Sequence, residues 1–239
     1  MSPMATVLTV KDLGVSFEGE TYIEGINFTI DEGEGLAVIG PNGAGKSVLL
    51  RALLGMIPYR GTIAWTPGIR LGYVPQKIDA DRHLPINVQN LLNAKAATLR
   101  LSKKDIDETI KAVGLDRKIL ETPVGHLSGG QFQRALIGFS LLGKPSVLML
   151  DEPTASIDKP GEEMVYELLH RLQEQYRMTV ILVSHDLTFV YRYASKVLCL
   201  NKSGLCFGAP EEALTPDVLK NLYGVQKHFH QDHQDHHHA

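Results

Sequence analysis

The 239-residue sequence predicts an α/β fold in which helices cover a mostly parallel core sheet. Strands buried on both faces are indicated by continuously apolar segments at residues 36–39, 71–74, 147–150 and 180–183. An antiparallel β subdomain before the core is indicated by alternating segments at residues 7–10, 14–17 and 26–30. Helical spacing prevails from about residue 77 to residue 144, so we expect an inserted α-helical subdomain there.

The helices are marked by their starting residues. A capping box begins at Ser102, and a second helix is expected at residues 128–142. A further helix is expected at residues 158–176, with proline in its first turn. After about Thr215 the chain becomes polar and loses its pattern.

A glycine or polar side chain follows each continuous core segment. These residues are Gly40, Gln76, Asp151 and the pair Ser184-His185. Ligands of open α/β sheets bind beyond the carboxyl ends of the strands. We therefore expect the chemistry to collect at one edge of one sheet.

Composition narrows the functional classes. The net charge is -3, with 44% hydrophobic and 21% charged residues, so nothing indicates a nucleic-acid partner. No apolar run approaches the roughly 18–20 residues that span a bilayer, and the N-terminus lacks a signal-peptide pattern. We expect a protein that is soluble by itself in the cytoplasm and reaches a membrane only through a partner.

The two cysteines, Cys199 and Cys206, flank a predicted hairpin turn at residues 201–204. A four-residue loop would pair Leu200 with Leu205 and the two cysteines with each other. One interpretation is a redox-sensitive or metal-binding thiol pair. The interpretation that we favour is two small apolar side chains that stay reduced in the cytosol.

A phosphate-binding loop lies between a buried strand and a predicted helix. It consists of Gly40, Pro41, Asn42, Gly43, Ala44, Gly45, Lys46 and Ser47. The glycines let successive backbone N–H groups turn inward, and the helix dipole favours an anion at the same place. Lys46 can reach the β- and γ-phosphates of a nucleotide, and the Ser47 hydroxyl can bind Mg²⁺.

Two further segments accompany this loop. They are Leu127-Ser128-Gly129-Gly130-Gln131 and the strand at residues 147–150, which ends in Asp151-Glu152. The three segments, in this order, resemble those of the ATP-binding subunits of ABC (ATP-binding cassette) transporters. The resemblance covers about residues 6–213. It implies a P-loop NTPase (RecA-like) core, ATP hydrolysis with Mg²⁺, and an ABC-type ATP-binding domain at residues 1–227.

The resemblance also implies catalytic roles. Asp151 would hold Mg²⁺, and Glu152 would orient and deprotonate the attacking water. Gln76 would contact Mg²⁺ or that water, and His185 would hydrogen-bond the γ-phosphate. The alternatives are a structural salt bridge for Glu152 and a satisfied strand-end histidine for His185.

Other positions carry ATP contacts by the same resemblance. Phe17 stands where an aromatic residue stacks on adenine, with Tyr22 as a weaker candidate and core packing as the alternative. Asp158 ends a segment that lies across a dimer interface. Val48 replaces the usual Thr or Ser, so only its backbone N–H remains for phosphate.

Residues Ser128, Gly129, Gly130 and Gln131 open a helix and form a second potential phosphate site. The family resolves this duplication with a head-to-tail homodimer, in which each nucleotide lies between the loop of one subunit and this segment of the other. An isolated chain is then expected to hydrolyse ATP poorly. The resemblance implies polytopic membrane permease subunits as partners, with the chain at the cytoplasmic face of the membrane.

Softer similarities, at residues 83–88, 198–201 and 215–224, point to zinc and manganese uptake systems, which implies an extracytoplasmic solute-binding protein as well. The tail at residues 228–239 is histidine-rich, and His230, His233 and His236 would share one face if it were helical. It is either a metal-binding tail or a disordered segment or tag remnant. Alternatives for the whole chain are an ABC ATPase for another substrate, a soluble ABC ATPase, and a nucleotide-dependent regulatory module.

Overall fold

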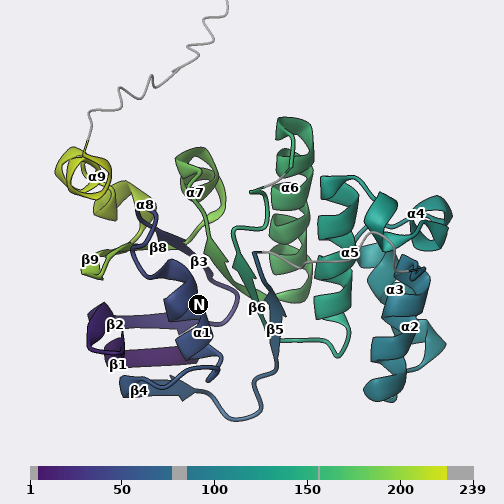
Figure 1. The fold of residues 1–239 in the computed structure, drawn as a ribbon, viewed down its shortest axis with the longest axis horizontal. Coiled ribbons are helices and arrows are strands. Elements are labelled where there is room, and N and C mark those ends of the chain that lie inside the picture. The colour runs from purple at the N-terminus through teal and green to yellow at the C-terminus, as the bar shows by residue number, and fades with distance from the viewer. Residues whose placement is uncertain (1–4, 77–84, 156, 225–239) are drawn as a thin grey trace, which may run out of the picture.

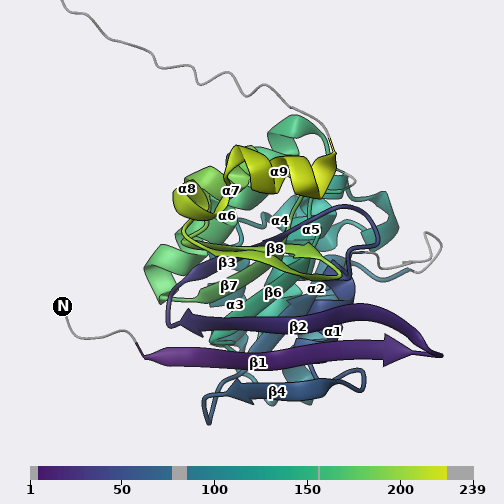
Figure 2. The ribbon, with the colours of Figure 1, turned by 90° about the vertical axis from the view of Figure 1, so that its left-hand side faces the viewer.

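The computed structural model describes residues 5–76, 85–155 and 157–224. Within them, the strands form one sheet in the order β4-β1-β2-β9-β8-β3-β7-β6-β5 (Figures 1 and 2). The strands are β1 (Thr6–Phe17), β2 (Glu20–Asp31), β3 (Gly35–Ile39), β4 (Arg60–Trp65), β5 (Leu71–Val74), β6 (Val147–Asp151), β7 (Thr179–Val183), β8 (Lys196–Asn201) and β9 (Ser203–Gly208). The predicted α/β fold with a parallel core is confirmed.

The core strands β8, β3, β7, β6 and β5 pair in parallel and send alternate side chains to opposite faces. Val147 and Met149 of β6 pack with helix α1 (Lys46–Leu53). Leu148 and Leu150 pack with α5 (Gly129–Leu141) and α6 (Lys159–Tyr176) on the other face. Helices thus cover both faces, as the continuously apolar strands indicated.

The antiparallel part is simpler than the sequence suggested. The two alternating runs at residues 7–10 and 14–17 belong to one long strand, β1, which pairs with both β2 and β4. The register shifts between Val10 and Leu13, and Asp12 there has a positive φ of 48°. The polar interruption is therefore a local bulge rather than the end of a strand.

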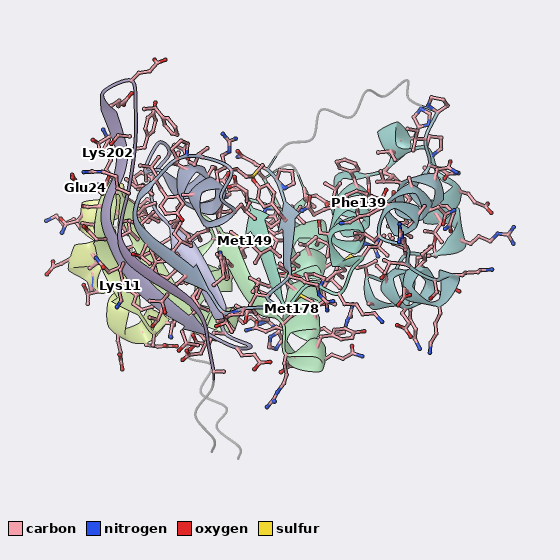
Figure 3. All side chains as sticks on the ribbon, turned by 90° about the horizontal axis from the view of Figure 1, so that it is seen from below. Lys11, Glu24, Phe139, Met149, Met178 and Lys202 are labelled. Carbon is pink, nitrogen blue, oxygen red and sulfur yellow. A yellow bond between two sulfur atoms is a disulfide. The ribbon has the colours of Figure 1, made fainter. Side chains whose placement is uncertain are left out.

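The chain segment that connects β5 to β6 forms a group of helices, which lies far from β1 and β2 (Figure 1). Ser102 begins α3 with a capping box, as predicted, and Ser128 begins α5 with another. Besides α5, this group contains α2 (Val88–Thr98), α3 (Lys103–Ala112), α4 (Arg117–Glu121) and the short 3₁₀ helix at Val124–His126. In Figure 3 the label Phe139 shows where α5 of this helical group lies, and the label Met149 shows where β6 of the sheet lies.

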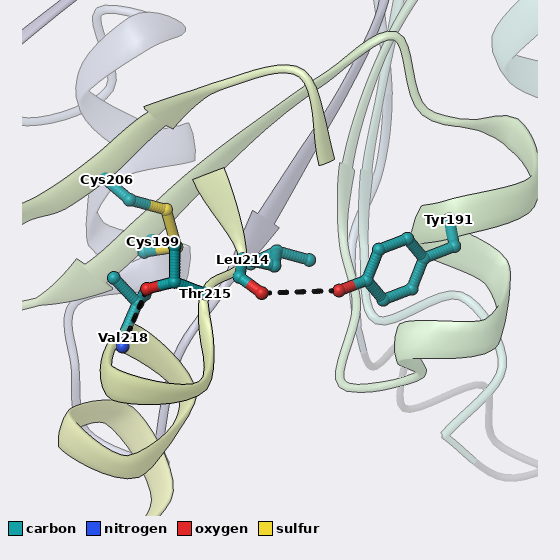
Figure 4. The surroundings of a disulfide bond; sticks show 6 residues. All are labelled: Tyr191, Cys199, Cys206, Leu214, Thr215 and Val218. Carbon is teal, nitrogen blue, oxygen red and sulfur yellow. Dashed lines mark hydrogen bonds between the residues drawn. A yellow bond between two sulfur atoms is a disulfide. The ribbon is translucent and has the colours of Figure 1, made fainter. Parts of the chain in front are cut away.

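The chain after Thr215 forms a helix, although its sequence pattern is weak. Helices α7 (Leu187–Tyr193), α8 (Pro210–Ala213) and α9 (Pro216–Tyr223) cover β8, and Leu222 is buried. Thr215 caps α9 by accepting a hydrogen bond from the Val218 N–H (Figure 4). A short helix with so few buried residues gives little periodic signal. His230, His233 and His236 lie outside the described residues.

The cysteine prediction was partly wrong. Cys199 and Cys206 pair across the β8–β9 hairpin, but the turn is tighter than expected, since Leu200 pairs with Gly204. The structure joins the two sulfur atoms in a disulfide rather than leaving free thiols (Figure 4). Their Cα atoms lie 4.8 Å apart, within the range that a disulfide bridges. Among the described helices, none has the length and apolar character that crossing a bilayer requires.

Candidate functional site

The phosphate loop connects β3 to α1, and its backbone is open to an anion. Gly43 and Gly45 have positive φ values of 80° and 95°, and Gly45 is the N-cap of α1. Such left-handed residues turn neighbouring N–H groups toward one concave surface. A Cβ at Gly40 would overlap the carbonyl oxygen of Leu200 on β8, so glycine is required where these backbones meet.

Lys46 is buried, and its ammonium group lies over the loop itself. Nζ donates to the carbonyl oxygens of Gly40, at 2.9 Å, and Pro41, at 3.1 Å. The same Nζ lies 3.7 Å from Oε1 of Glu152. The structural salt bridge weighed for Glu152 is therefore present, and its partner is the lysine of the phosphate loop.

Gln76 follows β5, and Asp151 and Glu152 lie at the end of β6, so they meet at one sheet edge. Nε2 of Gln76 donates to Oε2 of Glu152 at 2.7 Å. Glu152 has a positive φ of 46°, which is uncommon for a non-glycine residue and concentrates at functional sites.

Asp151 is only 3% exposed, and its Oδ1 has no hydrogen-bond partner among the described residues. Burial raises the pKa of the Asp151 carboxyl, while the hydroxyl of Ser47 acts to lower it. A buried oxygen without a donor is an expensive group unless a cation meets it. A hard divalent cation that takes oxygen ligands suits Asp151 and Ser47.

His185 follows β7 and is exposed. The residue before it, Ser184, is buried. β7 pairs with both β3 and β6, which places the turn after it between the phosphate loop and Glu152. Gln76, Asp151, Glu152 and His185 thus leave neighbouring strands at the same edge.

Phe17 ends β1 and is partly buried against the core. Its ring stands edge-on to Tyr22, with the centroids 5.7 Å apart. The chain at Tyr22 and Ile23 runs directly beside Gly45 of the phosphate loop. Both aromatic candidates for adenine stacking therefore lie next to the loop, while Val48 packs partly buried against the same core.

The segment Ser128, Gly129, Gly130 and Gln131 begins α5, where Ser128 accepts from the Gln131 N–H at 3.3 Å. This helix packs on the face of the sheet opposite to α1. Within one chain, the structure does not bring this segment to the phosphate loop. Asp158 is the exposed N-cap of α6, and Gly130 lies near the start of that helix.

A buried polar cluster lies beneath these turns and was not predicted from the sequence. Thr154, Glu162, Tyr166 and Ser184 contact one another and are 7%, 7%, 5% and 3% exposed, respectively. Tyr166 follows the apolar spacing of its helix, so its pattern matches ordinary core packing. Glu162, a charged residue among the buried residues of the same helix, was the available signal.

Comparisons with known proteins agree with the resemblance found in the sequence. Similarity is high to proteins named zinc import ATP-binding protein ZnuC. That of Brucella abortus (strain 2308) is 36% identical over 237 residues, covering 97% of this chain and 78% of the relative. That of Yersinia enterocolitica is 37% identical over 243 aligned residues, covering 98% and 95%.

Solved structures agree. A metal-chelate type ABC transporter in an inward-facing conformation superposes with a TM-score of 0.83 at 28% identity, covering 93% of this chain and 90% of the other. CbiO1 from Clostridium perfringens, part of the complex cbiONQ, gives 0.76 at 28% identity, with coverages of 87% and 90%. A family model for ABC transporters matches residues 23–155. The chain therefore belongs to the ABC transporter family.

Proposed function

We propose that this chain is the ATP-hydrolysing subunit that powers a membrane permease importing a divalent metal, zinc or manganese. The observation that carries the catalytic part is the convergence of Lys46, Glu152 and Gln76 beyond the ends of the core strands. The zinc import proteins and the metal-chelate transporter named above support the choice of substrate. Zinc is the metal that the relatives' names carry.

Binding of ATP would use the loop as it stands. The N–H groups around Gly43 and Gly45 would face the phosphates, and the N-terminus of α1 would add its positive dipole. Lys46 would exchange the carbonyls of Gly40 and Pro41 for phosphate oxygens, which carry full negative charge. Phe17 and Tyr22 would cover the adenine.

Mg²⁺ fits the oxygen donors at this edge. Asp151 Oδ1 is buried and unpartnered among the described residues, and the Ser47 hydroxyl and the Gln76 side chain are the other candidate ligands. When bound, the ion would neutralise charge on the phosphates. Glu152 would then orient and deprotonate the attacking water, and His185 would donate to the γ-phosphate.

Closure of the site requires a second copy of the chain. The phosphate loop and the Ser128–Gln131 segment begin helices on opposite faces of the sheet, which supports a site shared between two chains. A head-to-tail homodimer would place Ser128, Gly129 and Gly130 of one subunit against the γ-phosphate held by the other. Asp158 would lie across that interface. The dimer would work at the cytoplasmic face of the membrane with the permease and, for import, a solute-binding protein.

Uptake of radiolabelled metal by cells tests this proposal. Cells lacking the chain would receive either the wild-type chain or the Lys46→Ala variant, and zinc and manganese would be offered separately. The wild type should restore uptake of zinc, and the variant should not, because its phosphate contacts are lost. Uptake of manganese alone would correct the substrate. Restoration by the inactive variant, or no restoration of either metal, would contradict the proposal.

A further inference from the structure

Side chains from the first two helical turns of α6 contact both the loop after β6, which carries Glu152, and the loop after β7, which carries His185. On one side is Thr154, two residues after Glu152, and on the other is Ser184, which precedes His185. Tyr166 lies between them: its hydroxyl oxygen is 3.0 Å from Thr154 Oγ1 and 3.4 Å from Ser184 Oγ. α6 stands beside β6 and near α7 in Figure 1, where it can reach both turns.

The protons of these hydroxyl groups can be assigned. Thr154 Oγ1 donates to Glu162 Oε1 at 3.1 Å, and the Tyr166 hydroxyl donates to the same oxygen at 3.2 Å. Tyr166 can then accept from Ser184, and Ser184 accepts from the Asp186 N–H at 3.0 Å. The bonds thus run from Asp186 through Ser184 and Tyr166 to the Glu162 carboxylate, which Thr154 meets from the other side. Chains of this kind strengthen each other's bonds in a low-dielectric interior.

The two ends of this chain are themselves held. The other oxygen of Glu162, Oε2, accepts from Lys159 Nζ at 2.9 Å, and that Nζ lies 3.9 Å from Asp186 Oδ2. Lys159 is largely exposed, so this link is weak by itself. The Tyr166 ring stacks on Phe189 of α7, with the centroids 3.9 Å apart, which fixes the position of its hydroxyl. Burial raises the pKa of Tyr166 to about 12, so the hydroxyl keeps its proton at neutral pH.

We propose that Tyr166 and Glu162 are positioning residues for ATP hydrolysis, which hold the turn of His185 in a fixed relation to the turn of Glu152. The inference rests on the ATPase function proposed above. Neither side chain needs to touch the nucleotide. Because the phosphate loop is not part of the chain of hydroxyl groups, ATP binding does not depend on it.

The Tyr166→Phe variant tests this directly. It keeps the stacked ring and removes only the hydroxyl, which breaks the link to Ser184 while leaving the bond from Thr154 to Glu162. We expect kcat for ATP hydrolysis to fall about 10-fold or more, with KM and equilibrium ATP binding within about twofold of wild type. The matched control is Tyr191→Phe, whose hydroxyl bonds to the Leu214 carbonyl on the far side of α7 (Figure 4) and should leave kcat unchanged.

Two further variants separate positioning from general destabilisation. Glu162→Gln keeps an acceptor oxygen and should retain most of kcat, whereas Glu162→Leu should lose it to the extent seen for Tyr166→Phe. Thr154→Val removes the neighbouring hydroxyl, and combining it with Tyr166→Phe should cost little beyond either change alone, because both break one chain. Thr154→Val also gives an independent test if Tyr166→Phe folds poorly.

The outcomes are distinguishable from failure of the proposed function. A wild-type chain that, assembled with its permease, hydrolyses ATP no faster than Lys46→Ala would remove the proposed function itself. An active wild type, with Tyr166→Phe and Thr154→Val both within twofold of its kcat, would overturn the positioning role alone. The same conclusion would follow if Tyr166→Phe raised KM while leaving kcat intact.

Discussion

Gln76 donates a hydrogen bond from Nε2 to Oε2 of Glu152, with 2.7 Å between the two atoms. The contact joins the residues that follow β5 and β6, two strands paired in parallel. Lys46 approaches the other oxygen of the same carboxylate at 3.7 Å. The group that is proposed to activate water is therefore held by two neighbours. Lys46 is a proposed phosphate contact, and Gln76 is a proposed Mg²⁺ ligand.

Changing Gln76 to glutamate should show what this amide does. Gln76→Glu would place two carboxylates within hydrogen-bond distance, and one of them would take up a proton because like charges disfavour double ionisation. We expect ATP turnover at neutral pH to fall roughly 10-fold or more below that of Gln76→Ala. The alanine variant loses the hydrogen bond without adding charge. Equal turnover in the two variants would contradict a charge effect at Glu152.

Substitution of Gly40 by alanine tests the contact between the phosphate loop and β8. A Cβ there would overlap the Leu200 carbonyl in addition to requiring a left-handed backbone. We expect a loss of about 3 kcal/mol in unfolding free energy, together with loss of ATP binding. Gly19→Ala is the control, because Gly19 has a φ of +81° but open space around it, and should cost only about 1 kcal/mol.

Urea unfolding followed by the fluorescence of Trp65, the single tryptophan, would measure both glycine variants. Similar losses in the two variants would mean that backbone conformation alone explains Gly40, and that the close approach of Leu200 has no energetic effect.

Alkaline pH should destabilise the folded chain through Tyr166. The unfolded chain releases this phenolic proton near pH 10, whereas burial holds the folded pKa at about 12. The stabilisation is complete below pH 10 and is lost as pH rises toward 12, since the unfolded state then binds fewer protons. The loss should reach roughly 2–3 kcal/mol relative to Tyr166→Phe. Unfolding curves at pH 8 and pH 11.5 that change equally in both proteins would disprove the assignment.

The histidine-rich tail provides a prediction from sequence alone. Removing residues 228–239 should abolish zinc binding measured by titration calorimetry, while ATP turnover stays unchanged. Within the described residues there is no group of three His, Cys, Asp or Glu side chains that could hold a metal. Zinc binding unchanged by the truncation would end the idea.

A matched pair of variants tests which histidines of the tail act together. Replacing His230, His233 and His236 by glutamine should weaken zinc binding more than replacing His228, His237 and His238. Equal effects would show that the number of histidines matters rather than a shared face.

Much of the fold was predictable because buried parallel strands have an unmistakable composition. Each of the four continuous segments became a core strand, and the polar residue after each one lies at the same sheet edge. The capping box at Ser102 was also predictable, because it depends on residues only three apart, and the helix start at Ser128 was predicted as well. Local and strongly periodic signals were thus sufficient for the framework.

The remainder depended on contacts that no local pattern records. The bulge at Asp12 and the tight β8–β9 turn follow from strand pairing, and α9 is ordered by packing against β8. The hydrogen bonds of the cluster around Tyr166 and Glu162 join residues that are 4 to 18 positions apart in the sequence. In the sequence each member has the pattern of an ordinary core, cap or turn residue. The hydrogen bonds between them become visible only in the folded structure.

The most direct test of the account is the size of the Glu152→Gln variant in solution with MgATP, measured by light scattering after gel filtration. Without the carboxylate the nucleotide should persist, and the paired surfaces should hold two chains together. We predict a dimer with MgATP, and a monomer either without nucleotide or when Lys46→Ala is added. A Glu152→Gln chain that stayed monomeric in MgATP, even when purified with its permease, would contradict the shared nucleotide site.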